Sequence, residues 1–65
     1  MKSILYVFVN RSGKIETFQG RILPEEQNDP DDALLDRYQP ENVKVAVEAH
    51  IEPGFSLCNW HVIES

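Results

Sequence analysis

The most regular alternation of hydrophobic and polar residues lies between residues 42 and 52. The apolar set there is Val43, Val45, Val47, Ala49 and Ile51, and the polar set is Lys44, Glu48, His50 and Glu52. Only Ala46 breaks this period of two. Because successive side chains of a strand point to opposite faces, the pattern predicts an antiparallel strand with one face on a core and one face in water.

The beginning of the chain predicts a β-hairpin. Residues 4–9 are apolar at every position, which is typical either of a central strand or of a strand with an apolar patch on the open face of its sheet. Asn10 and Gly13 then favour a turn into a second strand over residues 14–23. Within that strand, Gly20 predicts a bulge or a close approach of another group.

The end of the chain predicts one more strand. Pro53 and Gly54 stand between two β-like segments, which indicates a tight turn of type II. The last strand is expected over residues 55–63, although its two faces mix apolar and polar residues.

A helix is predicted over residues 30–39. Asp29 suits the N-cap, Pro30 suits the first helical position, and Pro40 is expected to end the helix. Its apolar side consists of Leu34, Leu35 and Tyr38. A helix this short is unstable alone, so we expect that side to pack on the valine face of the 42–52 strand.

These elements define a single small α+β domain over residues 1–65: a four-stranded antiparallel sheet with one short helix on one face, in the order β-β-α-β-β. A domain of this size buries only roughly 60% of the surface of its unfolded chain. Cys58 is the only cysteine, so no disulfide can form within the chain, and association with a second copy is the remaining support. One hypothesis is therefore a homodimeric structural or regulatory subunit that associates through the apolar open face of its sheet. Its aromatic anchors would be Tyr6, Phe8 or Trp60.

No sequence motif indicates catalysis, a metal or a cofactor. Cys58 and His61 are three apart in a predicted strand and would point to opposite faces, so Cys58 is expected to be buried and His50 to be a solvated surface residue. A calcium loop would need a glycine where Leu34 stands. A metal-assisted enzyme using His50, His61 and carboxylates is the least favoured alternative. We therefore expect a protein that is not an enzyme and has neither cofactor nor metal.

The negative charge is concentrated in one segment. Residues 25–41 contain seven acidic residues and one basic residue, a net charge of −6. The rest of the chain contains four acidic and five basic residues, a net charge of +1, so the whole chain has a net charge of −5. Acidic side chains commonly keep a helix surface solvated. Alternatively, they would bind a basic groove that normally holds nucleic acid. The candidate partner-binding residues are Glu25, Glu26, Asp29, Asp31, Asp32 and Asp36.

In size, acidity and lack of a catalytic motif, the chain is similar to small phage-borne inhibitors of the anti-restriction and anti-CRISPR classes, some of which mimic DNA. This resemblance concerns composition rather than a motif. It implies an inhibitor that presents an acidic surface to a basic, nucleic-acid-binding protein. The six basic residues are scattered, so we expect no direct binding to nucleic acid. The apolar run of residues 4–9 is too short for a signal peptide or a membrane span, so a cytoplasmic protein is expected.

Overall fold

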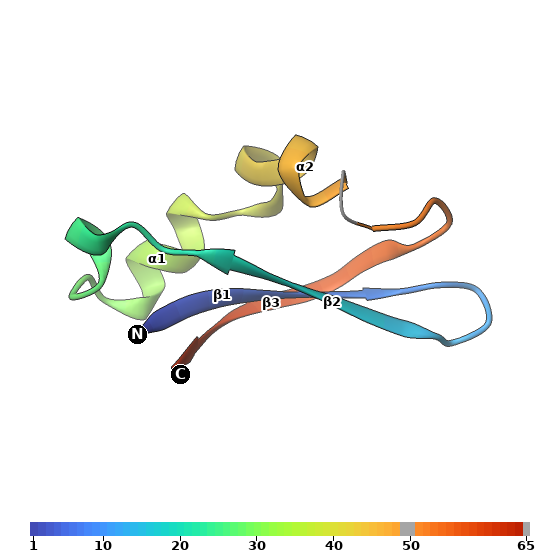
Figure 1. Cartoon of the computed structure of the whole chain (residues 1–65), viewed down its shortest axis with the longest axis horizontal. Helices are drawn as coiled ribbons and strands as arrows, with labels where there is room; N and C mark the ends of the chain where they lie inside the picture. The colour runs from blue at the N-terminus through green and yellow to red at the C-terminus, as the bar shows by residue number, and fades with distance from the viewer. Residues whose placement is uncertain (49–50, 65) are drawn as a thin grey trace.

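A computed structural model describes residues 1–48 and 51–64, and includes the side chains of these residues except at positions 45–48. The described chain forms two layers, a three-stranded sheet and a layer of short helices on one side of it (Figure 1). The strands are β1 (Lys2–Val9), β2 (Ile15–Arg21) and β3 (Ser56–Glu64); the helical segments are η1, a 3₁₀ turn (Pro24–Glu26), α1 (Asp31–Arg37) and α2 (Pro40–Glu48).

The prediction of a four-stranded sheet in the order β-β-α-β-β is wrong. The described sheet has three antiparallel strands in the spatial order β2-β1-β3, and most of the segment expected to form a further strand is the helix α2. The fold is still a small α+β domain. Of the predicted strand residues, Ala49 and His50 lie outside the described part of the chain, and Ile51 follows the helix without joining a strand.

Pro40 explains much of this difference. A proline ends a helix that precedes it, but it also suits the first position of a new helix, where its missing N–H has no partner to lose. In the structure it opens α2, and the N–H of Asn42 bonds to the carbonyl of Gln39 at 2.8 Å. Lys44, Ala46 and Glu48 are good helix formers. The helix therefore outweighs the strand preference of the valines.

β1 is the central strand, as one interpretation of its apolar sequence predicted. It pairs with β2 along one edge and with β3 along the other. One of its faces carries Ile4, Tyr6 and Phe8, which are all buried. Together with Ile22 and Leu34 they form the core of the described chain.

α1 packs through the residues that the helical pattern selected. Leu34 is fully buried, and Leu35 and Tyr38 are partly buried against the core. Two hydrogen bonds join this region to the sheet: the Tyr6 hydroxyl donates to the Tyr38 carbonyl at 2.7 Å, and the Trp60 indole donates to the Leu35 carbonyl at 3.4 Å. The helix therefore lies on the sheet and not on a valine strand.

The predicted turn at residues 10–13 is confirmed, and a turn also lies at Pro53 and Gly54, although no strand precedes it. Gly13 and Gly54 both have positive φ, at 82° and 97°, and the Asn10 side chain accepts hydrogen bonds from the N–H groups of Ser12 and Lys14. Gly20 lies at a close approach: a Cβ there would be 3.2 Å from the ring of Tyr6. The pairing of β1 with β2 is continuous at this position, so the close approach, and not a bulge, explains this glycine.

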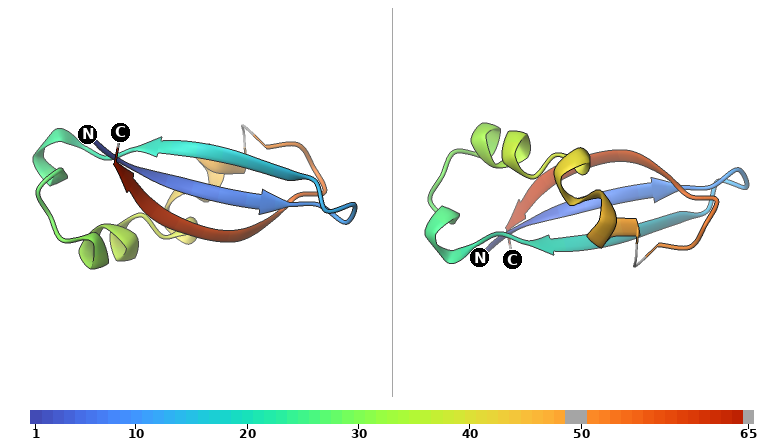
Figure 2. Two further views of the ribbon diagram at one scale, coloured as in Figure 1. Left: turned by 90° about the horizontal axis from the view of Figure 1, so that it is seen from below. Right: turned by 90° about the horizontal axis from the view of Figure 1, so that it is seen from above.

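The second face of the sheet has no helix over it (Figure 1), and the view from below shows the three strands in front of α2 (Figure 2). Alternation along β1 and the register with its neighbours place Leu5, Val7 and Val9 on this open face, with Ile15 beside Val9 and Ile63 beside Ser3. The aromatic anchors predicted for the open face are wrong. Tyr6 and Phe8 are buried under the helices, and Trp60 is paired with Tyr6 and bonded to α1.

Candidate acidic binding surface

The acidic candidates gather at one end of an elongated molecule. The described chain measures 37 × 20 × 16 Å along its principal axes. η1 and α1 lie at the end that also holds the two termini, and the turn between β1 and β2 lies at the other end (Figure 1). The concentration of charge in residues 25–41 is therefore also a concentration in space.

Three of the six candidate carboxylates form ion pairs within the fold. Arg37 bonds to Asp29 at 3.0 Å and also to Glu26. Lys2 bonds to Asp31 at 3.1 Å. The Glu26 side chain is only 13% exposed. These carboxylates join the loop before α1 to the helix and to β1, a structural role that the sequence pattern did not reveal.

Tyr38 extends this network. Its hydroxyl donates to Glu26 Oε1 at 2.6 Å and accepts the N–H of Leu23 at 3.2 Å. Burial, followed by the hydrogen bond to Glu26, raises the pKa of Tyr38. The hydrogen bonds to Asp29 and then to Glu26 raise the pKa of Arg37. Both shifts favour the protonation states that the network uses, a neutral phenol and a charged guanidinium.

Asp29 does not have the predicted N-cap role. α1 begins at Asp31 with Pro30 at the N-cap position, and no side chain caps it. The Asp29 carboxylate forms an ion pair with Arg37 instead. Asp29 therefore lies outside α1, whereas Asp32 and Asp36 lie one turn apart on this helix.

The remaining candidates, Glu25, Asp32 and Asp36, are exposed. We call them the acidic pole. Asp36 accepts a hydrogen bond from the Gln39 amide at 2.8 Å, a neutral partner that leaves its charge uncompensated. The fold thus separates the six candidates into three that are paired with cations and three whose charge faces solvent.

The Gln27 side chain attaches the acidic end to the sheet. Its oxygen accepts the N–H of Lys2 at 2.7 Å, and its nitrogen donates to the carbonyls of Lys2 and Ile22 at 3.1 Å each. The side chain therefore bonds to the first residue of β1 and to the residue just after β2. This contact holds η1 in place beside the strands.

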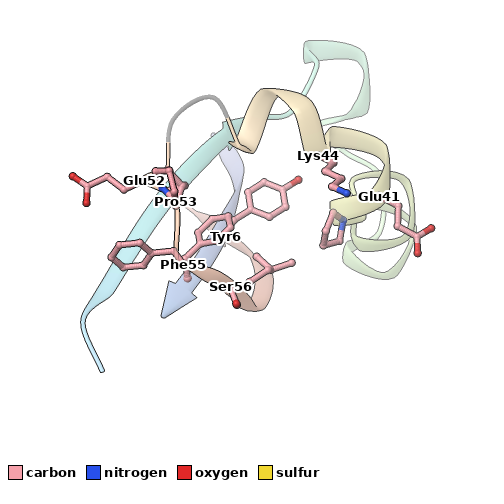
Figure 3. A pocket seen from close by; sticks show the side chains of 11 residues that line it. Tyr6, Glu41, Lys44, Glu52, Pro53, Phe55 and Ser56 are labelled. Atoms are coloured by element: carbon pink, nitrogen blue, oxygen red, sulfur yellow. The ribbon is translucent and has the colours of Figure 1, made fainter. Parts of the chain in front are cut away.

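A cavity of about 550 Å³ lies between the start of α2, the segment before β3 and the middle of β1. Its lining is mainly apolar, and Glu41, Lys44, Glu52 and Ser56 contribute polar groups. Figure 3 shows the Glu41 and Glu52 side chains pointing away from the cavity. The one polar group of Tyr6 is engaged, since its hydroxyl bonds to Tyr38. The carboxylates near this cavity therefore do not converge on a common point.

The cysteine and the histidines do not form a catalytic or metal-binding site within the described residues. Cys58 is exposed, so its predicted burial is wrong. The register between β1 and β3 shifts at this position: Asn59 pairs with Val7 and Leu57 pairs with Phe8, so Cys58 has no partner residue on β1. An extra residue of this kind is left out of the strand pairing. His61 is exposed on β3, and His50 lies outside the described residues. Within the described residues, no three His, Cys, Asp or Glu side chains are grouped to hold a metal ion.

No helix in the described part of the chain is long and apolar enough to cross a bilayer. No protein-family model, curated protein or solved structure matches the chain.

Proposed function

We propose that the protein is a small, non-enzymatic binding protein whose acidic pole occupies a basic site of a partner protein and excludes nucleic acid from that site. The observation that supports this proposal most directly is the separation of the carboxylates. Lys2 and Arg37 are engaged by Asp31, Asp29 and Glu26, whereas Glu25, Asp32 and Asp36 are exposed at the same end.

The spacing of these charges is compatible with such a site. Asp32 and Asp36 are four residues apart on α1, which is a rise of about 6 Å. Phosphates follow each strand of duplex DNA at a rise of about 3.4 Å. A basic groove that neutralises every second phosphate therefore has cations at a similar spacing, which makes a DNA-mimicking inhibitor the specific form of this proposal.

The position of the acidic pole at one end also favours binding. A charged end can enter a groove without contact from the rest of the molecule, and long-range attraction to a basic site speeds association at low salt. A partner that handles nucleic acid inside the cell would place the protein in the cytoplasm.

The test is affinity capture from a lysate of the source organism, with immobilised wild-type protein and the D32K/D36K variant. We expect the wild type to retain a nucleic-acid-binding protein that is released by high salt and by added duplex DNA. The charge-reversed variant should lose at least tenfold in the amount retained, because two carboxylates in the contact become repulsive. Circular dichroism should remain unchanged, since both side chains are exposed.

The matched control is E16K/E52K, which reverses two glutamates outside the acidic end. Each double variant adds four charges and changes the net charge from −5 to −1. If the control loses as much retention as D32K/D36K, net charge and not the acidic pole is responsible, and the proposal fails. It fails equally if DNA does not compete with the captured protein.

A further inference from the structure

The open face of the sheet has the wrong polarity for a surface in water. An antiparallel sheet with helices on one side normally places polar residues on its other side. Here the side of the central strand without helices carries Leu5, Val7 and Val9 in succession, each partly exposed, and the neighbouring Ile15 is 63% exposed. A line of apolar residues along a central strand is typical of an interface.

We propose that a second copy of the protein covers this open face, sheet against sheet. The surface is separate from the acidic pole, so the inference does not depend on the proposed function. The described core contains only five buried residues, and the sequence offers no disulfide. Domains of this length usually need a further source of stability besides their core. A second copy of the same chain can provide it, because it is present whenever the protein is expressed.

The size of the face agrees with a reversible dimer. Strands of seven to nine residues are about 26 Å long, and three of them are about 14 Å wide. Allowing for the relief of the side chains, two such faces bury about 1,000 Å² in total, close to the lower limit of specific interfaces. Interfaces near this limit are mostly weak and reversible.

The chemistry of the face suits self-association better than a charged partner. The apolar line is flanked by uncharged residues of β2 and β3, and Arg21 at one corner is the only residue of the face with a formal charge. The flanking residues in register are Thr17, Gln19, Asn59 and His61. An apolar centre with a polar rim is the usual anatomy of a protein interface.

Charge along the long axis selects the orientation of the two copies. The turn at one end carries Arg11 and Lys14, of which Lys14 pairs with Glu16 at 3.6 Å, and the acidic pole lies at the other end. A two-fold axis that crosses the strands places each basic turn beside the acidic end of the partner, whereas a parallel arrangement would bring both acidic ends together. In this arrangement the lines of Leu5, Val7 and Val9 in the two protomers run antiparallel to each other, in sheets about 10 Å apart.

The experiment is sedimentation equilibrium of the wild type, V7K and L23K between about 1 and 500 μM. One chain has a mass of 7.5 kDa, so we expect the wild type to approach twice that mass. V7K places a charge in the centre of the face and should weaken the dimer at least tenfold. L23K is the matched control, because Leu23 is 53% exposed and lies outside the sheet. It should dimerise like the wild type.

A monomeric wild type at 500 μM would overturn the proposal, as would a dimer that V7K leaves intact or that L23K weakens equally. If V7K does not fold, isotope-filtered NOE spectra of mixed labelled and unlabelled wild-type protein decide the matter. They should show contacts among the Leu5, Val7 and Val9 methyl groups of different chains. Their absence from a dimeric sample would also overturn the proposal, because the copies would then meet elsewhere.

Discussion

At the scale of single residues, the polar groups inside this small fold have specific partners. Tyr6 is 1% exposed, yet its hydroxyl reaches the carbonyl of Tyr38, and Tyr38 in turn bonds to Glu26. No buried side-chain nitrogen or oxygen of the described residues lacks a hydrogen-bond partner. Such satisfaction matters in a thin core, because one unpaired buried group costs about 1–3 kcal/mol.

Replacing Tyr6 by phenylalanine tests this contribution. Y6F removes the donor to the Tyr38 carbonyl and should lower the free energy of unfolding by about 1 kcal/mol at neutral pH. Urea denaturation measures this change. An unchanged midpoint would mean that the hydrogen bond contributes nothing to stability.

The same variant should alter the response to alkaline pH. Burial, and to a lesser extent the nearby Tyr38, raises the pKa of Tyr6 from 10 to about 12. The neutral phenol is therefore favoured in the folded state, so its contribution is complete below pH 10 and is lost as pH rises from 10 to 12. Y6F should decline less steeply over this range, although Tyr38 still contributes. Parallel curves for the two proteins would contradict this assignment.

At the scale of elements, the helical layer depends on its attachment to the sheet. α1 has seven residues and α2 has nine, and helices of this length are unstable alone. Leu34 supplies the apolar contact of α1, and the Gln27 side chain ties η1 to the ends of β1 and β2. One amide side chain thus connects the helical layer to two strands of the sheet.

We expect Q27A to lower the free energy of unfolding by about 1–3 kcal/mol, because three hydrogen bonds to backbone groups are lost. Amide hydrogen exchange at Lys2 should accelerate, since its N–H donates to Gln27. The control is N28A, a neighbouring exposed position, which should change stability by less than about 0.5 kcal/mol. Equal effects of the two variants would show that Gln27 has no special role.

At the scale of the whole molecule, the surface of the described chain has regions of different polarity and charge. Helices cover one face of the sheet, apolar residues remain on the other, and the acidic pole occupies one end. The apolar face and the acidic pole share no residues, but the dimer orientation proposed above also places the basic turn of one copy beside the acidic pole of the other.

Dimerisation predicts that thermal stability depends on concentration. A ligand that binds only the folded state stabilises it by mass action, and here the ligand is the second copy. Raising the concentration 100-fold, well above the dissociation constant, should add up to about 2.7 kcal/mol per mole of dimer, or about 1.4 kcal/mol per chain. Differential scanning calorimetry should show a rising Tm for the wild type and a constant Tm for V7K. A Tm that is independent of concentration for both proteins would argue against the dimer.

Local sequence signals were sufficient to predict the hairpin and the first helix. The hairpin follows from the apolar run of β1 and from Asn10 and Gly13, and α1 follows from the spacing of Leu34, Leu35 and Tyr38. These residues specify backbone conformation or a buried side by themselves. The acidity of residues 25–41 was equally visible, but the pairing of Glu26 and Asp29 with Arg37 was not, because it joins segments through space.

The sequence by itself determined a small α+β class, the hairpin, the first helix and the location of the charge. Tertiary structure decided the state of α2, because alternating valines allow a strand whereas Pro40 and the helix-forming residues allow a helix, and packing selects between them. It also decided which face of β1 is buried. That strand is apolar on both sides, so only the position of the helices leaves Leu5, Val7 and Val9 uncovered.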